Sequence, residues 1–296
     1  MKSFISLDWG TTSFRGYEVG ADGAIKNQTS AADGITAVKD GAFEQTLESH
    51  IGAWDKSLPI VASGMITSRQ GWVECAYAEC PADVSSLAQT ITNIKTATGR
   101  EVHFITGLHY KSPSIQHDVL RGEETQVFGA LATGATHFVT PGTHSKWIET
   151  KDRRIESFAT YMTGESFALY SKQSILGRLM QGEDHDEQAF ARGVEQSFAD
   201  PAGILHSLFS TRSLGLFNAL PATALHSYLS GLLIGQEVAH ATMAHDHDAH
   251  YMVLGSAAIA ASYISAMKCA GLNVQLGNPL CGIEGQRVIA HQAGII

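Results

Sequence analysis

Cysteine and proline are scarce in this chain of 296 residues, which contains 4 cysteines and 7 prolines. The cysteines, at positions 75, 80, 269 and 281, form no C-x-x-C motif and are too few for a disulfide framework. We therefore expect reduced, mostly buried thiols in a cytoplasmic protein. The first apolar run is short and is followed by Asp8, so we expect no signal peptide.

Positive charge and long apolar runs are lacking as well. Lys and Arg number 20 against 29 acidic residues, and the net charge of -9 argues against a nucleic-acid partner, because phosphate backbones bind basic surfaces. The longest uncharged stretch, Ala249–Met267, contains His250 and Gly255, so we predict a buried strand and a small-residue helix and no membrane contact. The 44% of hydrophobic residues suffices for a packed core, and the length favours one large or two medium domains.

Glycine is plentiful, and the 29 glycines include two that open similar turns. A strand over 4–7 leads into the polar turn 8–13, a second strand over 14–19 and a further turn at 20–23. This pattern predicts a β-meander, whereas Walker A and dinucleotide-binding loops join a strand to a helix. A shift of 132 residues superposes Gly10–Ser13 on Gly142–Ser145 in the same strand–turn–strand context, which predicts two related halves.

The remaining pattern predicts a mixed α/β chain. We expect the likeliest domain boundary at the Pro- and Ser-bearing stretch 111–114. Strands are expected at 60–62, 102–105, 251–254 and 273–276. Helices are expected at 43–54, 84–98, 163–180, 185–198, 200–211, 221–244 and 257–270.

The two Gly-Thr turns suit a polyphosphate, because backbone N–H groups of tight glycine turns and Thr or Ser hydroxyls donate to phosphate oxygens. Asp8, at a strand end, could hold Mg²⁺ through water beside the phosphates. The turn at Gly255–Ser256, between a strand and a helix, lets a nucleotide approach the helix start. The alternative is two ordinary hairpin turns, with Asp8 and Ser256 acting as caps.

Two further segments could carry chemistry. Gly122-Glu123-Glu124 opens a helix, where a carboxylate either complements the helix dipole or takes a proton from a substrate hydroxyl. The loop Gly64–Trp72 is rich in hydrogen-bonding groups and suits a polyhydroxylated acid, although a surface loop has similar residues. The spacing in His245–His250 matches no common zinc site, so we expect a solvated loop there.

An ordered set of motifs resembles the 2-dehydro-3-deoxygalactonokinase family of the sugar kinase, Hsp70 and actin superfamily. The motifs are D-W-G-T-T-S-x-R, G-M-x-x-S-x-x-G-W, R-G-E-E-T-Q, P-G-T-H-S-K-W, M-T-G-E and S-G-L-L-I-G. They lie at Asp8–Arg15, Gly64–Trp72, Arg121–Gln126, Pro141–Trp147, Met162–Glu165 and Ser230–Gly235.

The resemblance implies an α/β fold of two ribonuclease-H-like (actin-like ATPase) domains flanking a deep cleft. Residues 1–115 would form the N-terminal domain, with the sugar-acid site and the first phosphate loop, and residues 116–296 the C-terminal domain, with the second loop and the adenosine site. The implied reaction is Mg²⁺- and ATP-dependent phosphorylation of the 6-hydroxyl of 2-dehydro-3-deoxy-D-galactonate in galactonate catabolism. The alternatives are 2-keto-3-deoxy-gluconate or a hexosamine as substrate, and an Hsp70- or actin-like ATPase, although 296 residues leave no room for a long peptide-binding domain.

The resemblance also implies roles for single residues. The nucleotide would bind Gly10, Thr11, Thr12, Ser13, Gly142, Thr143, His144, Ser145, Gly255 and Ser256, with Asp8 beside Mg²⁺. Arg15 and Lys146 could neutralise charge on the transferring phosphoryl. We favour Glu123 as the base over Glu124 and Asp8. Related sugar kinases place a Gly-Asp pair at a helix start, and Gly122-Glu123 precedes the second phosphate loop at Gly142 by a similar number of residues. The sugar-acid residues would be Gly64, Met65, Ser68, Arg69, Trp72, Arg121 and Glu165, with Arg69 or Arg121 on the carboxylate. The apolar helices after residue 160 could carry the surface of a homodimer.

Overall fold

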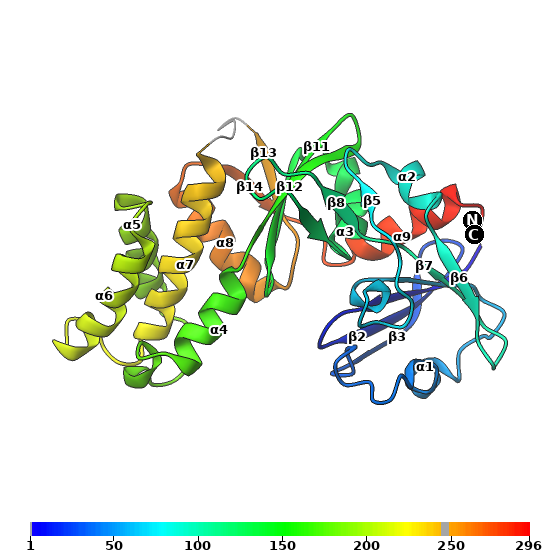
Figure 1. The fold of residues 1–296 in the computed structure, drawn as a ribbon, viewed down its shortest axis with the longest axis horizontal. Helices are drawn as coiled ribbons and strands as arrows, with labels where there is room; N and C mark the ends of the chain where they lie inside the picture. Colours follow the sequence, from blue (N-terminus) through cyan, green and yellow to red (C-terminus); the bar gives the residue numbers. More distant parts are fainter. Residues whose placement is uncertain (1, 244–248) are drawn as a thin grey trace. The chain divides into compact units, whose positions relative to one another are not determined.

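The computed structural model describes residues 2–243 and 249–296. The chain folds into two compact units (Figure 1). The first comprises Met1–Thr133, Glu149–Phe158 and Asn278–Ile296, and the second Gly134–Ile148 and Ala159–Gly277. The expected boundary at 111–114 therefore falls inside the first unit, between two strands of a small sheet. The predicted loop at 245–248 lies outside the described residues.

A six-stranded sheet forms the centre of the first unit, in the order β3-β2-β1-β4-β7-β6. Its strands are β1 Phe4–Trp9, β2 Phe14–Val19, β3 Ile25–Ala31, β4 Ile60–Ser63, β6 Thr92–Lys95 and β7 Glu101–Phe104. The first three strands form the predicted antiparallel meander, and β4 pairs parallel with both β1 and β7. Because β1 is covered on both faces, its apolar residues are fully buried. A small second sheet contains β5 Ala78–Glu79, β8 Leu108–Tyr110 and β9 Asp118–Leu120.

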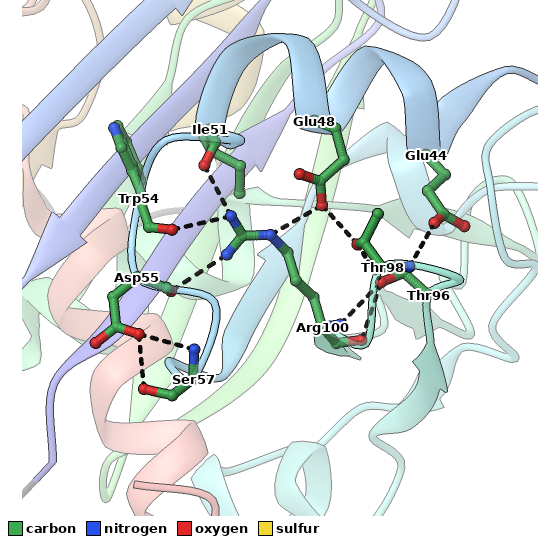
Figure 2. A network of polar contacts seen from close by, with 9 residues as sticks. All are labelled: Glu44, Glu48, Ile51, Trp54, Asp55, Ser57, Thr96, Thr98 and Arg100. Atoms are coloured by element: carbon green, nitrogen blue, oxygen red, sulfur yellow. Dashed lines mark hydrogen bonds and ion pairs between the residues drawn. The ribbon is translucent and has the colours of Figure 1, made fainter.

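Helices complete the first unit. They are α1 Phe43–Ile51, α2 Val84–Ala88, α3 Glu123–Ala130 and α9 Cys281–Gln292, with 3-10 turns η1 Met65–Thr67 and η2 Leu131–Thr133. Helices α3 and α9 cross closely, because a side chain at Gly129 or Gly285 would overlap the backbone of the other helix. The end of α1 is held by the guanidinium of Arg100, which donates to the carbonyl groups of Ile51, Trp54 and Asp55 (Figure 2).

The second unit combines a five-stranded sheet with a helical bundle. The sheet order is β12-β11-β10-β13-β14, with β10 His137–Thr140, β11 Ser145–Lys151, β12 Arg154–Tyr161, β13 His250–Val253 and β14 Asn273–Leu276. The helices are α4 Thr163–Gln173, α5 Glu187–Ala199, α6 Ile204–Leu216, α7 Leu225–Thr242 and α8 Ala257–Cys269, with the 3-10 turn η3 Gly177–Leu179. Helices α4 to α7 lie side by side in Figure 1, and α5 and α7 touch at the glycines Gly193 and Gly231.

The two main sheets share one strand order. β3-β2-β1-β4-β7 corresponds to β12-β11-β10-β13-β14, and in both sheets the last two pairings are parallel. This correspondence confirms the prediction of two related halves with ribonuclease-H-like sheets. Among the described residues, no helix is both long and apolar enough to cross a membrane. All four cysteines are free, and Cys75 and Cys281 are buried.

The helix predicted over 84–98 is wrong in its second half. Helix α2 ends at Ala88, and β6 occupies Thr92–Lys95 beside β7. The β-branched Thr92 and Ile94 favour this edge strand, and the pairing with β7 outweighs the weaker helical pattern. Helix α9 and the small sheet were not predicted, because their apolar residues are few and irregularly spaced.

Candidate active site

The first Gly-Thr turn joins β1 to β2 and is closed by a hydrogen bond from the backbone N–H of Gly10 to the carbonyl of Ser13 (2.9 Å). Thr11 and Thr12 are exposed at its tip. A segment following β3 supports the turn from below, since both the backbone N–H and the hydroxyl of Thr36 donate to the carbonyl of Thr11. The turn is therefore a fixed loop with exposed hydroxyls at its tip.

Gly34 determines how closely this supporting segment approaches. A Cβ atom at Gly34 would overlap the backbone of Thr11 and Thr12. Only glycine allows this contact, because it has no side chain. Gly34 was missed in the sequence, where the only signal is a glycine shortly after the third strand.

Asp8 lies opposite Arg15 in the β1–β2 ladder, and the two side chains form an ion pair of 2.8 Å. Desolvation raises the pKa of Asp8 above its usual value, while Arg15 lowers it. Because 42% of the Asp8 side chain is exposed, water and the ion pair with Arg15 both favour the charged form of the carboxyl group. Asp8 therefore offers a carboxylate with one oxygen already bound to a cation.

Two glycines bring distant segments next to Asp8. Gly64, at the end of β4, has a φ of 95°, and a Cβ there would lie 3.4 Å from the Asp8 carboxylate and 2.9 Å from the carbonyl oxygen of Trp9. Gly122, which precedes α3, has a φ of 109°, and its Cβ would lie 3.2 Å from the Cα of Gly64. The positive φ angles and the close approach both require glycine. The ends of β1 and β4 and the start of α3 thus meet within the first unit.

Glu123 and Glu124 begin α3 but differ in environment. Glu123 is half-buried, and its carboxylate accepts the backbone N–H of Arg121 at 2.8 Å. Glu124 is completely buried and accepts the N–H of Gly122 at 2.6 Å. Burial, with the charge of Glu123 second, raises the pKa of Glu124 to about 8. Glu124 is therefore mostly protonated at neutral pH, which makes it a poor base.

The loop Gly64–Trp72, which was predicted to bind a sugar acid, presents fewer accessible polar groups than its sequence indicates. Met65 is half-buried, Arg69 is exposed, and Ser68 is buried with a hydroxyl that has no partner among the described residues. Trp72 is half-buried and packs against the core, with ring centroids 6.1 Å from Phe43 and 5.8 Å from Phe104. Part of its ring surface is therefore used in aromatic packing, and its contact with substrate stays a prediction.

The guanidinium of Arg121 is engaged mainly in contacts with Thr67 and Tyr77. One terminal nitrogen donates to the backbone oxygen and the hydroxyl of Thr67, at 2.5 and 2.6 Å. The guanidinium also stacks 4.1 Å above the ring of Tyr77. These contacts indicate that Arg121 stabilises the loop Gly64–Trp72, whereas Arg69 is exposed and more accessible to a carboxylate.

The second Gly-Thr turn resembles the first in its exposed tip and in the glycine that packs against it. Gly142, Thr143 and His144 are exposed between β10 and β11. A Cβ at Gly164, just after β12, would overlap the carbonyl oxygen of Gly142, and the N–H of Glu165 donates to the carbonyl of Thr143 at 2.9 Å. Gly164 therefore supports the second turn as Gly34 supports the first.

His144, Ser145 and Lys146, in and after the second turn, already have side-chain partners. His144 pairs with Glu165 of α4, so the structure gives Glu165, predicted to bind substrate, a partner in the turn. Lys146 is buried and donates to the hydroxyl of Thr160 at 3.0 Å. The hydroxyl of Ser145 is buried as well and faces away from solvent.

An apolar cavity of about 90 Å³ adjoins the second turn. Its lining includes Gly142, Gly164, Phe167, Leu233, Ile259 and Tyr263. The turn at Gly255–Ser256 lies nearby, since a Cβ at Gly255 would be 3.6 Å from the ring of Pro141, and Ser256 is exposed. Two of the sequence motifs, Met162–Glu165 and Ser230–Gly235, contribute to this cavity, which their spacing alone could not reveal.

Comparison with known proteins agrees with these features. The family model of 2-keto-3-deoxy-galactonokinase matches residues 8–286. A probable 2-dehydro-3-deoxygalactonokinase of Rhizobium meliloti (strain 1021) is 35% identical over 92% of this chain and 91% of its own length. The 2-dehydro-3-deoxygalactonokinase of Escherichia coli (strain K12) is 33% identical over 97% of each chain.

Solved structures show the same relationship. A crystal structure from Sinorhizobium meliloti, named provisionally as a 2-dehydro-3-deoxygalactonokinase protein, has a TM-score of 0.89 and 34% identity over 97% of this chain and 98% of its own. The activator of 2-hydroxyisocaproyl-CoA dehydratase from Clostridium difficile, with a TM-score of 0.50 and 10% identity over 98% and 95% of the two chains, shares the fold alone. With a family match over nearly its whole length, the chain belongs to the 2-keto-3-deoxy-galactonokinase family.

Proposed function

We propose that this chain transfers the γ-phosphoryl group of ATP to the 6-hydroxyl of 2-dehydro-3-deoxy-D-galactonate, giving 2-dehydro-3-deoxy-6-phosphogalactonate in galactonate catabolism. The observation that carries the proposal is the pair of Gly-Thr turns, each exposed at its tip and each supported by a glycine, in a chain of this family. We also propose a cytoplasmic location, because few and free cysteines suit a reducing compartment. The homodimer stays a prediction.

ATP would bind by its phosphates and by its base. The backbone N–H groups and hydroxyls of Thr11–Ser13 and of Gly142–His144 would donate to phosphate oxygens, and Gly10, whose N–H closes the first turn, would let the phosphates approach closely. The apolar cavity beside the second turn would receive the adenine ring, with the exposed Ser256 at its edge. Lys146 and Arg15 would add positive charge near the phosphates, each by exchanging a present partner for phosphate oxygen.

Asp8 fits a Mg²⁺ ion by its chemistry, because the partly exposed carboxylate offers the hard oxygen ligand that Mg²⁺ prefers. When bound, Mg²⁺ would neutralise charge on the phosphates. Arg15 would hold the Asp8 carboxylate in place before nucleotide binds.

Glu123 would act as the base. The 6-hydroxyl oxygen attacks the γ-phosphorus, the bond from that phosphorus to the bridging oxygen of ADP breaks, and the hydroxyl proton passes to the Glu123 carboxylate. The helix dipole stabilises a carboxylate at this first position of α3. Arg69 would pair with the carboxylate of the sugar acid, since its guanidinium is exposed.

A panel of 2-keto-3-deoxy acids with ATP tests the proposal. We expect the galactonate-series acid to give the highest kcat/KM and the gluconate-series acid and a hexosamine lower values. In the same assay, Glu123→Gln should lower kcat by about 10²-fold, the usual contribution of a general base. ATP hydrolysis that proceeds equally without any sugar acid would contradict the kinase assignment, and a near-normal kcat for Glu123→Gln would reassign only the base.

A further inference from the structure

Glu237, in α7, is a buried acid to which the proposed reaction assigns no role. Its side chain is 2% exposed. One carboxylate oxygen accepts the hydroxyl of Ser145 (2.8 Å) and the indole N–H of Trp147 (2.7 Å), and the other accepts the hydroxyl of Tyr263 (2.7 Å). Among the ion pairs of the described residues, none includes Glu237. The carboxyl group is therefore satisfied by neutral donors alone.

Such an arrangement is costly unless every donor is well placed. Burial raises the pKa of Glu237, and hydrogen bonds from Thr163, Tyr263, Trp147 and Ser145 oppose that shift. A buried polar network of this kind fixes one geometry, because each displaced donor leaves an unpaired polar group. The segments that carry the donors are thereby held in a single arrangement.

Those segments surround the second Gly-Thr turn. Ser145 directly follows His144, the last exposed residue of the turn. Thr163 directly precedes Gly164, which packs against the carbonyl of Gly142. Tyr263 belongs to α8, the helix that begins after the Gly255–Ser256 turn, and it also lines the apolar cavity. One carboxyl group thus joins the end of the turn, the segment that supports it and the helix beside the nucleotide cavity.

We propose that Glu237 is the positioning residue of the second phosphate turn. It acts through Ser145 and Trp147, which anchor the first residues of β11, and it holds the exposed donors of the turn in the arrangement that binds phosphate. Electrostatic stabilisation of a phosphoryl group depends on donors that are fixed before the substrate arrives. This inference rests on the proposed binding of ATP to the turn, whereas the identity of the sugar acid does not affect it.

Glu237→Gln tests the proposal, because the amide keeps the size of the side chain but cannot accept all three hydrogen bonds. We expect the Kd for ATP, measured by calorimetry, to rise about tenfold and kcat to fall, since small displacements of binding groups are costly. The KM for the sugar acid should stay within about twofold, since its expected binding loop belongs to the first unit. If Glu237 had a merely structural role, the substitution would lower the melting temperature but would not affect ATP binding more than the KM for the sugar acid.

Two further variants sharpen the test. Ser145→Ala removes only the donor nearest the turn, and it should also raise the Kd for ATP. In the double variant with Glu237→Gln, the increase in binding free energy should be smaller than the sum of the two single effects. Thr242→Val is the matched control, because Thr242 is also buried in α7 but donates only within that helix. It should leave ATP binding unchanged.

The positioning role would be overturned if either variant, Glu237→Gln or Ser145→Ala, folded and bound ATP as tightly as the wild type. Equal increases in the KM for ATP and the KM for the sugar acid would overturn it as well. Ser145→Ala keeps the question open to measurement if Glu237→Gln does not fold, since it leaves the carboxylate and its other donors in place. Wild-type protein that binds ATP but turns over no sugar acid would contradict the proposed function and leave the Glu237 comparison valid.

Discussion

At the scale of single residues, Glu124 links the start of α3 to the stability of the first unit. Its carboxyl group is completely buried, and its pKa of about 8 lies well above the ordinary value of 4.5. Below pH 4.5 the group is protonated in both the folded and the unfolded chain. Between pH 4.5 and 8 the unfolded chain releases the proton and the folded chain keeps it, so the free energy of unfolding falls as pH rises, by about 1.4 kcal/mol per pH unit.

Glu124→Gln should remove this dependence. The amide oxygen can still accept the N–H of Gly122, and the neutral side chain does not titrate. We expect the melting temperature of the variant relative to wild type to increase steadily from pH 5 to pH 8, as measured by scanning calorimetry. Glu195→Gln, at an exposed position of α5, is the control and should show no such trend. A constant difference across that range would mean that Glu124 is ionised in the folded protein.

The sequence indicated that two glutamates open a helix, but it could not show which one is buried. Adjacent residues of a helix point about 100° apart, and only the packing around the helix start decides which direction is covered. Trp72 and Ser145 illustrate the same limit. Both were predicted from motifs to contact ligands, but the sequence could not show that the half-buried Trp72 ring stacks on Phe43 or that the buried Ser145 hydroxyl donates to Glu237.

At the scale of elements, Arg100 connects the β6–β7 hairpin to the end of α1. Its side chain is fully buried, and its guanidinium pairs with Glu48 at 2.9 Å and donates to carbonyl groups just inside and beyond the helix end (Figure 2). The carbonyls of Ile51 and Asp55 also accept the backbone N–H groups of Trp54 and Leu58, and the cation adds a second hydrogen bond to each while opposing the helix dipole. Thr98 adds a hydrogen bond to Glu48.

Arg100→Lys should destabilise the first unit by about 3 kcal/mol. A lysine cannot reproduce the planar fork that reaches Glu48 and the backbone carbonyls together, and it leaves buried groups unpaired. Urea denaturation followed by tryptophan fluorescence measures the effect, because Trp9, Trp54 and Trp72 all belong to the first unit. Arg178→Lys, at an exposed position, should change the free energy of unfolding by less than about 0.5 kcal/mol. Equal midpoints for the two variants would show that Arg100 is dispensable.

Most long elements were predictable because their apolar residues recur with a clear period. The strands β1, β2 and β4 and the helices α5 and α7 follow their predicted ranges within a few residues. The helix prediction was wrong for residues 89–98 because strand β6 in this segment is stabilised by pairing with β7, and this pairing is not visible in the residue pattern of the segment itself.

At the scale of the whole molecule, the two units share one structural feature, an exposed turn supported by a glycine. Each has a meander whose first turn is exposed, and in each a glycine after the third strand packs under that turn. The repeat of Gly-Thr at a fixed shift predicted the two related halves, and the family resemblance implied their ribonuclease-H-like sheets. The supporting glycines could not be predicted, because their role depends on a backbone contact between segments more than 20 residues apart.

Gly34→Ala and Gly164→Ala should therefore have parallel effects. In each variant the new methyl group would overlap the backbone of a Gly-Thr turn, and the turn must shift to admit it. We expect each substitution to raise the Kd for ATP by about tenfold, as calorimetry would measure, since preorganised donors lose their alignment. Gly282→Ala is the control, because its Cβ would make only ordinary contacts in α9. If only one of the two variants weakened ATP binding, the two turns would not act as equivalent phosphate sites, despite the sheets that they share.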